Sequence, residues 1–238
     1  MFISKELLIN TAEKYKVSLD DLAVERFDTY ARLLVEWNKV MNLTGITEPD
    51  EIVIKHFVDS LTFLTYVDLP EGASLIDVGT GAGFPGLVLA AAYPNTQVTL
   101  LDSTGKKLKA VEDIAFNMGV TNIKIVHSRA EEAGKKSEFR EQYDFATARA
   151  VAELRVLLEY TLPFVKKNGT FLSLKAAIAE EEIHNATNSL KVLGGKIEGV
   201  EGFELPGGDK RAIIKVKKIS QLSPKYPRPS AQIAKKPL

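Results

Sequence analysis

The ten residues Asp77–Gly86, DVGTGAGFPG, contain two overlapping glycine signatures that point to different cofactors. Read from Gly81, the stretch matches the G-x-G-x-x-G fingerprint of dinucleotide-binding folds. Read from Asp77, it matches D-x-G-x-G-x-G, a loop more typical of proteins that bind S-adenosylmethionine (SAM). In either case a strand should end before the loop and a helix should begin after it, so that glycines let the backbone turn tightly against a ligand.

Around this loop, short runs of strand-forming residues alternate with stretches of helical composition. This alternation favours a parallel sheet that is covered by helices on both faces. The last two runs follow each other without a helix and predict an antiparallel hairpin, which completes a seven-stranded, doubly wound, Rossmann-like sheet. The predicted strands are SLIDV (74–78), QVTLLD (97–102), IKIVHS (123–128), YDFATA (143–148), GTFLSLK (169–175), 196–205 and 211–218, and the predicted helices among them are 86–93, 104–118, 151–162 and 179–193.

The first seventy residues are predicted to be helical. Apolar side chains recur there at spacings of three and four, which places them on one helical face, at Phe27, Tyr30, Leu34, Trp37 and Met41. Asp20 and Asp21 stand where an N-cap is expected, and a second helix should start near Pro49. We therefore divide the chain into an N-terminal helical extension (1–70), a SAM-binding domain (71–220) and a basic tail rich in Pro and Lys (221–238).

Composition excludes several kinds of chemistry. The chain has no cysteine, which removes disulfides, thiolate zinc sites and thiol nucleophiles, and we predict no metal site. Methylation of pyrimidine C5 is disfavoured for the same reason, because that reaction usually needs a cysteine. The N-terminus lacks the pattern of a secretory signal, and no apolar run is long enough to span a membrane. A cytoplasmic protein without a membrane partner is expected.

The formal net charge of zero hides an uneven distribution of charge. Residues 210–238 carry nine basic side chains and no acidic one, so the other 209 residues have 22 basic and 31 acidic side chains, a net charge of −9. A basic arm on an acidic body suggests a polyanionic partner such as nucleic acid. A solvated terminal strand and tail would give the same composition.

The residues around the glycines favour SAM over a dinucleotide. A carboxylate at Asp77 would repel a pyrophosphate, whereas it would suit a ligand that carries sulfonium and ammonium groups. Asp102 ends the next strand and can accept hydrogen bonds from both hydroxyls of an adenosine ribose, which NAD and SAM share. A dehydrogenase that binds NAD or FAD stays open as an alternative. The cofactor-binding candidates from this pattern are Asp77, Gly79, Gly81, Gly83 and Asp102.

Eight stretches, in this order and spacing, resemble the RsmG (GidB) family of bacterial small-subunit ribosomal RNA guanine-N7 methyltransferases. The resemblance covers essentially the whole chain and implies a class I SAM-dependent methyltransferase fold. The tail keeps the family's Tyr-Pro-Arg start and Pro-Leu end but lacks the glycine and the proline that usually lie between them. The stretches are LLVEWNKVMNLTGIT (33–47), KHFVDSL (55–61), DVGTGAGFPGLVLA (77–90), LLDSTGKK (100–107), SRAEE (128–132), YDFATARAVAEL (143–154), LPFVKKNG (162–169) and YPR (226–228).

The resemblance implies that methyl is transferred from SAM to N7 of one guanosine in the 530 loop of 16S rRNA, conventionally position 527. It also assigns roles to individual residues. Phe84 would pack against the methionine part of SAM, while the Ala130 backbone and the Glu131 side chain would contact the adenine. Arg149 would lie near the transferring methyl group and the incoming RNA, as a residue that binds cofactor and positions the reactants.

Guanine N7 carries a lone pair and no proton, so its methylation needs positioning but no general base. Lys175, at the end of a predicted strand, keeps a ribose 2′-O-methyltransferase open as an alternative, because that reaction would need a base near the acceptor. His56 and Asp59, three residues apart on a helix, are either an acid–base pair or a structural pair. Arg149 leaves its strand at the carboxyl edge of the sheet, where open α/β folds bind ligands.

The expected partner is 16S rRNA or a partly assembled 30S particle, and a monomer is the simplest oligomeric state. RNA contacts are predicted at Arg149 and at the basic residues of the tail, Lys225, Arg228, Lys235 and Lys236. Two further functions remain open from the residues alone. One is a methyltransferase with a small-molecule or protein acceptor, and the other is a non-catalytic ribosome-assembly factor that binds RNA and retains a SAM pocket.

Overall fold

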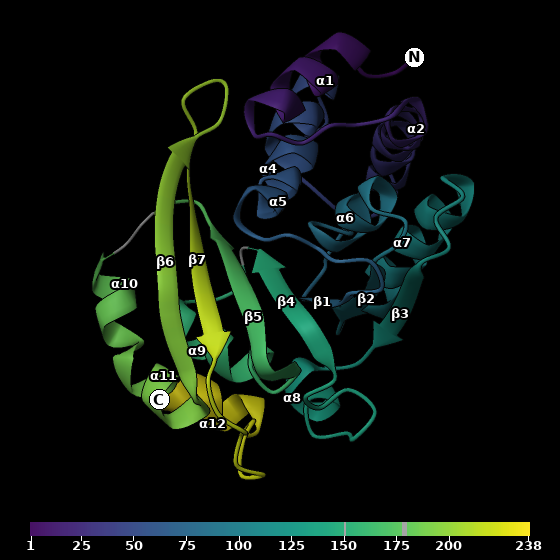
Figure 1. Ribbon diagram of the computed structural model, residues 1–238. Helices are drawn as coiled ribbons and strands as arrows, with labels where there is room; N and C mark the ends of the chain where they lie inside the picture. The colour runs from purple at the N-terminus through teal and green to yellow at the C-terminus, as the bar shows by residue number, and fades with distance from the viewer. Residues whose placement is uncertain (150, 178–179) are drawn as a thin grey trace.

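A computed structural model describes residues 1–149, 151–177 and 180–238 of the chain (Figure 1). Its centre is one seven-stranded sheet with the strand order β3-β2-β1-β4-β5-β7-β6. β1 to β5 are parallel, and β7 runs antiparallel to both β5 and β6, which confirms the predicted doubly wound sheet with a terminal hairpin. The strands are β1 (Ser74–Val78), β2 (Gln97–Asp102), β3 (Ile123–His127), β4 (Tyr143–Arg149), β5 (Val165–Lys175), β6 (Gly195–Glu204) and β7 (Lys210–Lys218).

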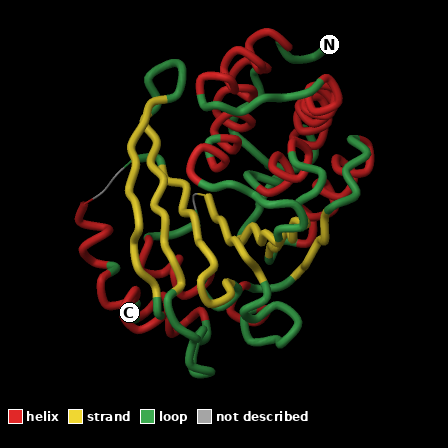
Figure 2. The backbone as a smooth tube through the Cα atoms, in the orientation of Figure 1, coloured by secondary structure: helices red, strands yellow, loops and turns green. Residues whose placement is uncertain are grey.

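Helices cover both faces of the sheet (Figures 1 and 2). One hydrophobic cluster joins the N-terminal helices, α6 and α7 to one face, and a second cluster joins α9 and α11 to the other. No helix among the described residues is both long and apolar enough to cross a membrane. The helices are α1 (Lys5–Lys14), α2 (Asp21–Asn38), α3 (Pro49–Ile52), η1 (Val53–Val58), α4 (Asp59–Leu61), α5 (Phe63–Tyr66), α6 (Gly86–Ala92), α7 (Gly105–Asn117), α8 (Ala130–Ala133), α9 (Leu154–Thr161), α10 (Glu180–Asn185), α11 (Thr187–Leu193) and α12 (Ser230–Lys235).

The N-terminal helices begin where the sequence predicts. The Asp20 carboxylate caps α2 by accepting a hydrogen bond from the Ala23 N–H at 2.7 Å, and Pro49 is the first residue of α3. Helix α2 ends at Asn38, so the predicted apolar stripe extends beyond it at Met41. The π-helix η1, which continues α3 directly and carries His56, was not predicted from the sequence.

Two predicted helices differ from the structure at their boundaries. The helix expected from residue 151 begins at Leu154, whose N–H donates to the Glu182 carboxylate at 2.5 Å, so a side chain from another helix satisfies this terminus. The helix expected over 179–193 is split into α10 and α11 at Ala186, and its first residue lies outside the described part of the chain. The division of the chain at residues 70 and 220 stays a prediction.

Candidate functional site

The glycine loop connects the end of β1 to the start of α6 at the carboxyl edge of the sheet. The N–H groups of Gly79 and Thr80 both donate to the Leu101 carbonyl, at 2.8 and 3.0 Å, which ties the loop to β2. Gly79 has a φ of +77°, and a Cβ there would lie 2.8 Å from a methyl carbon of Val151. Glycine therefore lets the segment after β4 close on the loop.

Asp77 stabilises the glycine loop by hydrogen bonds from within the protein and lines neither of the site's two cavities. It is fully buried, and its Oδ2 accepts hydrogen bonds from the Thr80 hydroxyl at 2.6 Å and from the Gly86 N–H at 2.8 Å. Within the described part of the chain, its Oδ1 has no hydrogen-bond partner, and neither does the hydroxyl of Thr147, the residue opposite Asp77 on β4. Burial raises the pKa of Asp77 to about 6, against the lowering effect of those hydrogen bonds and of the Arg149 charge.

A cavity of about 200 Å³ lies between the glycine loop and the ends of β2 and β3. We call it the loop pocket. It brings together residues from five segments of the chain. Four of these segments end or follow parallel strands, whose carboxyl ends meet at one edge, and the fifth is α9. It is lined by Val78, Gly79, Leu101, Asp102, Ser103, Ser128, Arg129, Ala130, Glu131, Val151 and Tyr160.

Asp102 is one of the two acidic residues that line the loop pocket, the other being Glu131. Its Oδ2 accepts a hydrogen bond from the Gly81 N–H at 2.9 Å, and its Oδ1 accepts one from the Thr104 N–H at 2.7 Å. Each carboxylate oxygen keeps a further lone pair, so the same group can also accept hydrogen bonds from a ligand. The carboxylate is thus fixed in orientation before any ligand arrives.

A second cavity, of about 280 Å³, lies beside the end of β4, and we call it the arginine pocket. Arg149 donates to Asp59 Oδ2 at 2.9 Å and to the Lys55 carbonyl at 3.2 Å, while Arg211 donates to Asp59 Oδ1 at 3.1 Å. Asp59 is 5% exposed, so one buried carboxylate orients two guanidinium groups. The pocket is lined by Lys55, His56, Asp59, Arg149, Leu174, Lys175, Ala176 and Arg211.

His56 is held neutral beside these arginines. Burial lowers its pKa to about 3, and the positive charges of Arg149 and Arg211 add to this effect. Its Nε2 lies 2.8 Å from the Thr44 hydroxyl, and its Nδ1 lies 3.4 Å from an Arg149 nitrogen. A histidine with this pKa can donate or accept a hydrogen bond, but it does not act as a cationic acid near neutral pH.

Phe84 connects the glycine loop to the arginine pocket. Its ring stacks on His56 with centroids 4.3 Å apart and on Tyr30 with centroids 5.1 Å apart, and the Arg149 guanidinium carbon lies 4.9 Å from its centre. Phe84 is only 5% exposed and lines neither pocket. In this structure it positions His56 and Arg149, and its contact with the methionine part of SAM stays a prediction.

Comparison with known proteins identifies this arrangement. A family profile described as "GidB: rRNA small subunit methyltransferase G" matches residues 23–214. The ribosomal RNA small subunit methyltransferase G of Thermoanaerobacter sp. strain X514 is 46% identical over 236 residues, which cover 99% of this chain and 98% of that protein. The protein of the same name from Alkaliphilus metalliredigens is 43% identical over 99% of both chains.

The chain belongs to the rRNA small subunit methyltransferase G family. It is therefore a SAM-dependent methyltransferase. Two solved structures show the same fold. A mutant of the 16S rRNA (adenine(1408)-N(1))-methyltransferase from Catenulisporales acidiphilia has a TM-score of 0.54 at 17% identity and covers 64% of this chain and 88% of its own. Precorrin-6y C5,15-methyltransferase from Geobacter metallireducens GS-15 has a TM-score of 0.52 at 15% identity, covering 72% and 88%.

The residues of the loop pocket fit SAM. Only glycine at position 79 leaves the backbone free to approach a ligand while Val151 packs against it. Asp102 offers oriented acceptors for ribose hydroxyls, and the buried Asp77 places a carboxylate under the loop, where a cationic ligand is favoured. A pyrophosphate above the same carboxylate would be repelled, which agrees with a SAM-dependent family.

The predicted cofactor residues of this methyltransferase divide into three groups. Gly79, Asp102, Ala130 and Glu131 line the loop pocket, whereas Arg149 lines the arginine pocket. The others line neither pocket and hold the conformation of the loop through backbone turns, hydrogen bonds and ring stacking, namely Asp77, Gly81, Gly83 and Phe84. Sequence reasoning gave no role to Ser103, Ser128 and Tyr160 of the loop pocket or to Arg211 of the arginine pocket. Ser103 and Ser128 lie within the family-like stretches 100–107 and 128–132, which could have indicated them.

In the structure, Arg228 of the tail makes an ion pair within the protein, and its predicted contact with RNA stays a prediction. Its side chain is 11% exposed and pairs with the fully buried Glu159 of α9, with nitrogen–oxygen distances of 2.6 and 2.8 Å. The guanidinium is thereby used to anchor the tail to α9. Lys225, Lys235 and Lys236 are exposed, and their contact with RNA stays a prediction.

Proposed function

We propose that this enzyme methylates N7 of a guanosine in the 530 loop of 16S rRNA, conventionally position 527, with SAM as methyl donor. The family name supports small-subunit rRNA as the acceptor. The atom and the position follow from the resemblance of the sequence to guanine-N7 methyltransferases. The geometry of the two adjoining pockets supports a transfer of this kind.

One observation carries the proposal: the end of β4 borders one pocket, and the segment directly after β4 borders the other. Arg149 lines the arginine pocket, and Val151, two residues further on, lines the loop pocket. A cofactor in the loop pocket and a base in the arginine pocket would therefore approach each other across this strand end. Such an approach is what direct transfer between two bound molecules requires.

The arginine pocket has the chemistry that N7 methylation needs. SAM supplies an electrophilic methyl group when it is bound. The acceptor nitrogen loses no proton, so no residue has to act as a base. Asp59 is occupied by two arginines and His56 is neutral, and both arrangements suit a pocket that binds and orients a base.

We assign recognition of guanine to the hydrogen-bond donors of the arginine pocket, Arg149 and Arg211. Arginine is the common partner of the guanine O6 and N7 acceptors in nucleic-acid complexes. Because N7 must stay free to receive the methyl group, we assign the contact to O6, from Arg149 or Arg211. The target base has to leave its stack to enter the pocket, as in other enzymes that modify a base.

Within the loop pocket we assign the ribose hydroxyls of SAM to Asp102 and the adenine to Ala130 and Glu131. Glu131 is 8% exposed, and it reaches the pocket from the first turn of α8. The Ala130 N–H is at the start of the same helix, where it is free to donate to an adenine ring nitrogen.

Nucleoside mass spectrometry of 16S rRNA tests the proposal directly. We expect one 7-methylguanosine to be lost from cells that lack this gene and to return when the gene is restored. Restoration with an Arg149→Ala variant should fail to return it. An unchanged 7-methylguanosine level in the deletion strain would reject the N7 assignment while leaving the cofactor assignment intact.

We also propose that the enzyme acts as a monomer. The large apolar side chains that are exposed among the described residues come from separate parts of the chain, at Met1, Leu22, Val40, Phe116, Val151 and Ile219. Light scattering should give the mass of one chain. Transfer assays with protein-free 16S rRNA and with isolated 30S particles would show which of the two is the acceptor.

A further inference from the structure

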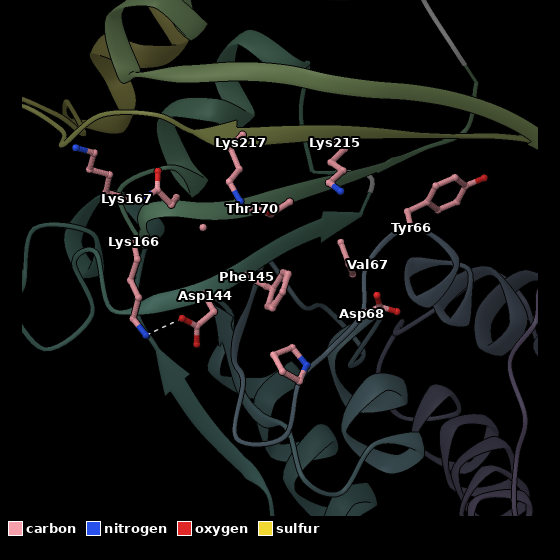
Figure 3. A pocket seen from close by; sticks show the side chains of 13 residues that line it. Tyr66, Val67, Asp68, Asp144, Phe145, Lys166, Lys167, Thr170, Lys215 and Lys217 are labelled. Atoms are coloured by element: carbon pink, nitrogen blue, oxygen red, sulfur yellow. Dashed lines mark hydrogen bonds and ion pairs between the residues drawn. The ribbon is translucent and has the colours of Figure 1, made fainter.

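A third cavity, of about 460 Å³, lies at the opposite ends of β4 and β5 from the arginine pocket (Figure 3). It is bordered by the start of β4, by the first residues of β5, by β7 and by the segment that leads into β1. Four lysines line this cavity, and we call it the lysine pocket after them. They are Lys166, Lys167, Lys215 and Lys217.

The lysines of this pocket are poorly neutralised by the protein. Lys166 pairs with Asp144 at 2.8 Å, as the dashed line in Figure 3 shows. Within the described part of the chain, Lys167, Lys215 and Lys217 have no carboxylate within 4 Å. Asp68 is the second acidic residue of the lining, which leaves an excess of positive charge.

The hairpin adds a further lysine beside this pocket. Lys196 of β6 stands directly opposite Lys217 of β7 in the strand register. Like charges in this position destabilise a sheet by a few tenths of a kcal/mol up to about 1 kcal/mol. A positive patch that costs stability in the free protein is what an anionic ligand would neutralise.

Aromatic side chains accompany the lysines. Phe145 of β4 and Tyr66 at the end of α5 line the same cavity, and both are only partly buried. Figure 3 shows Phe145 beside Thr170, below the side of β7 from which Lys215 and Lys217 project. Lysines along a groove together with partly exposed aromatic rings are the combination that binds single-stranded nucleic acid, because phosphates pair with the lysines and bases stack on the rings.

The lysine pocket and the arginine pocket share one face of β7. Side chains alternate along a strand, so Arg211, Lys215 and Lys217 project to the same side. At about 3.3 Å per residue, Lys217 lies about 20 Å along the strand from Arg211. An RNA strand that places its target base beside Arg211 would therefore reach the lysine pocket with nucleotides some distance from the target.

We propose that the lysine pocket binds phosphate groups of the single-stranded RNA that flanks the target base. This inference rests on the proposed function, since it takes the acceptor to be RNA. It assigns the main electrostatic contact to β5 and β7 and not to the C-terminal tail. The pocket contributes to affinity for RNA and takes no part in the methyl transfer itself.

The test replaces two lysines by a neutral, polar and shorter side chain, in the double variant Lys215→Gln with Lys217→Gln. Binding of a fluorescent 16S rRNA fragment containing the 530 loop is measured by anisotropy over a series of salt concentrations. We expect affinity to fall about tenfold and the salt slope to decrease by about 1.4, because each phosphate contact on a single strand contributes about 0.7. KM for the RNA should rise, while kcat and SAM affinity stay unchanged.

Two matched variants control for net charge and for folding. Lys14→Gln with Lys191→Gln removes two exposed charges from α1 and α11 and should leave affinity and salt slope as in the wild type. Lys215→Arg with Lys217→Arg keeps both charges and should bind RNA normally. A loss in the arginine variant as large as that in the glutamine variant would show that packing and not charge is involved, and it would overturn the proposal.

The remaining outcomes separate this proposal from the proposed function. An unchanged salt slope in the glutamine variant, with normal methylation of 16S rRNA by the wild type, would overturn the lysine pocket alone. Normal binding to free RNA but weakened binding to 30S particles would assign the pocket to an acidic protein surface and also overturn it. If the wild type methylates no rRNA, the proposed function fails, while the anisotropy comparison still decides whether the pocket binds RNA.

Discussion

Arg149 and Asp59 are 90 residues apart in the chain, yet their side chains meet at 2.9 Å in the arginine pocket. The same carboxylate receives Arg211 from β7, so a residue of α4 joins the ends of two strands. Because Asp59 is 5% exposed, its charge and those of its partners are poorly screened by water. The orientation of both arginines therefore depends on one side chain.

We expect Asp59→Asn to destabilise the protein by about 3–5 kcal/mol, because removal of one partner leaves buried charges unpaired. Methyl transfer should fall at least about tenfold, while SAM affinity stays near the wild-type value, since Asp59 does not line the loop pocket. Urea denaturation and single-turnover kinetics measure the two effects. The control is Asp209→Asn, at the more exposed Lys55–Asp209 pair, which should cost at most about 1 kcal/mol. Equal effects in the two variants would contradict the role of Asp59.

Asp102→Asn tests the proposed ribose contact. The amide keeps the shape of the carboxylate but loses its charge and one acceptor. Because hydrogen bonds to charged groups contribute about 1.5–3 kcal/mol, SAM affinity should fall about 10- to 100-fold in calorimetric titrations. Glu132→Gln, which neutralises an exposed carboxylate on α8, should leave SAM affinity unchanged. Wild-type affinity in the Asp102 variant would remove this residue from the cofactor site.

A comparison of two glycines with similar φ values distinguishes the effect of backbone strain from the effect of a steric clash with Val151. Gly79 and Gly72 have φ values of +77° and +76°, so an added Cβ costs roughly 1–2 kcal/mol of backbone strain at either position. Only at Gly79 would the Cβ also meet Val151, while nothing lies within 4 Å at Gly72. We expect Gly79→Ala to weaken SAM binding about tenfold or more and Gly72→Ala to leave it unchanged. Similar SAM affinities in the two variants would contradict the close approach of Val151.

Arg228→Ala should reduce stability rather than RNA affinity. It leaves the fully buried Glu159 without its charged partner, which costs about 3–5 kcal/mol in the free energy of unfolding. Lys225→Ala, at an exposed position three residues away, should change stability by less than about 0.5 kcal/mol. Denaturant titrations compare the two. If Arg228→Ala were as stable as the wild type but bound RNA more weakly, we would assign Arg228 to RNA binding and not to anchoring of the tail.

His56 should make the enzyme less stable in mild acid. Its folded-state pKa of about 3 lies below the value of 6.5 expected in the unfolded chain, so between these pH values only the unfolded chain binds the proton. The free energy of unfolding should therefore fall by up to about 1.4 kcal/mol per pH unit as pH drops below 6.5. Asp77 opposes this, because its raised pKa of about 6 lets the folded state bind a proton first.

The contribution of His56 can be isolated by substitution. Urea denaturation of the wild type and of His56→Gln at pH 7 and pH 4.5 gives the stability difference between the two proteins at each pH. We expect this difference to shift by about 2 kcal/mol in favour of the variant at the lower pH. A pH-independent difference would show that His56 is not held neutral by burial.

Much of the fold is readable from the sequence because local patterns encode it. β1 and β2 have the predicted boundaries, and the other strands differ from prediction mainly at their ends. β5 starts four residues early, since Val165 pairs with Tyr143 before the register shifts between β4 and β5. The π-helix η1 was not predictable in this way, because a wider helical turn leaves the spacing of the apolar residues nearly unchanged.

The sequence by itself determined the glycine loop, the acidic residue that ends the next strand and the succession of strands and helices along the chain, because each is a property of neighbouring residues. Only the tertiary structure decided what each charge does. Arg228 and Lys218 belong to the same basic stretch as Lys215 and Lys217, yet the first two pair with carboxylates, whereas the last two have no carboxylate within 4 Å among the residues that the structure describes. Electrostatic energy depends on distance in space, and the partners of these charges come from segments far away in the chain.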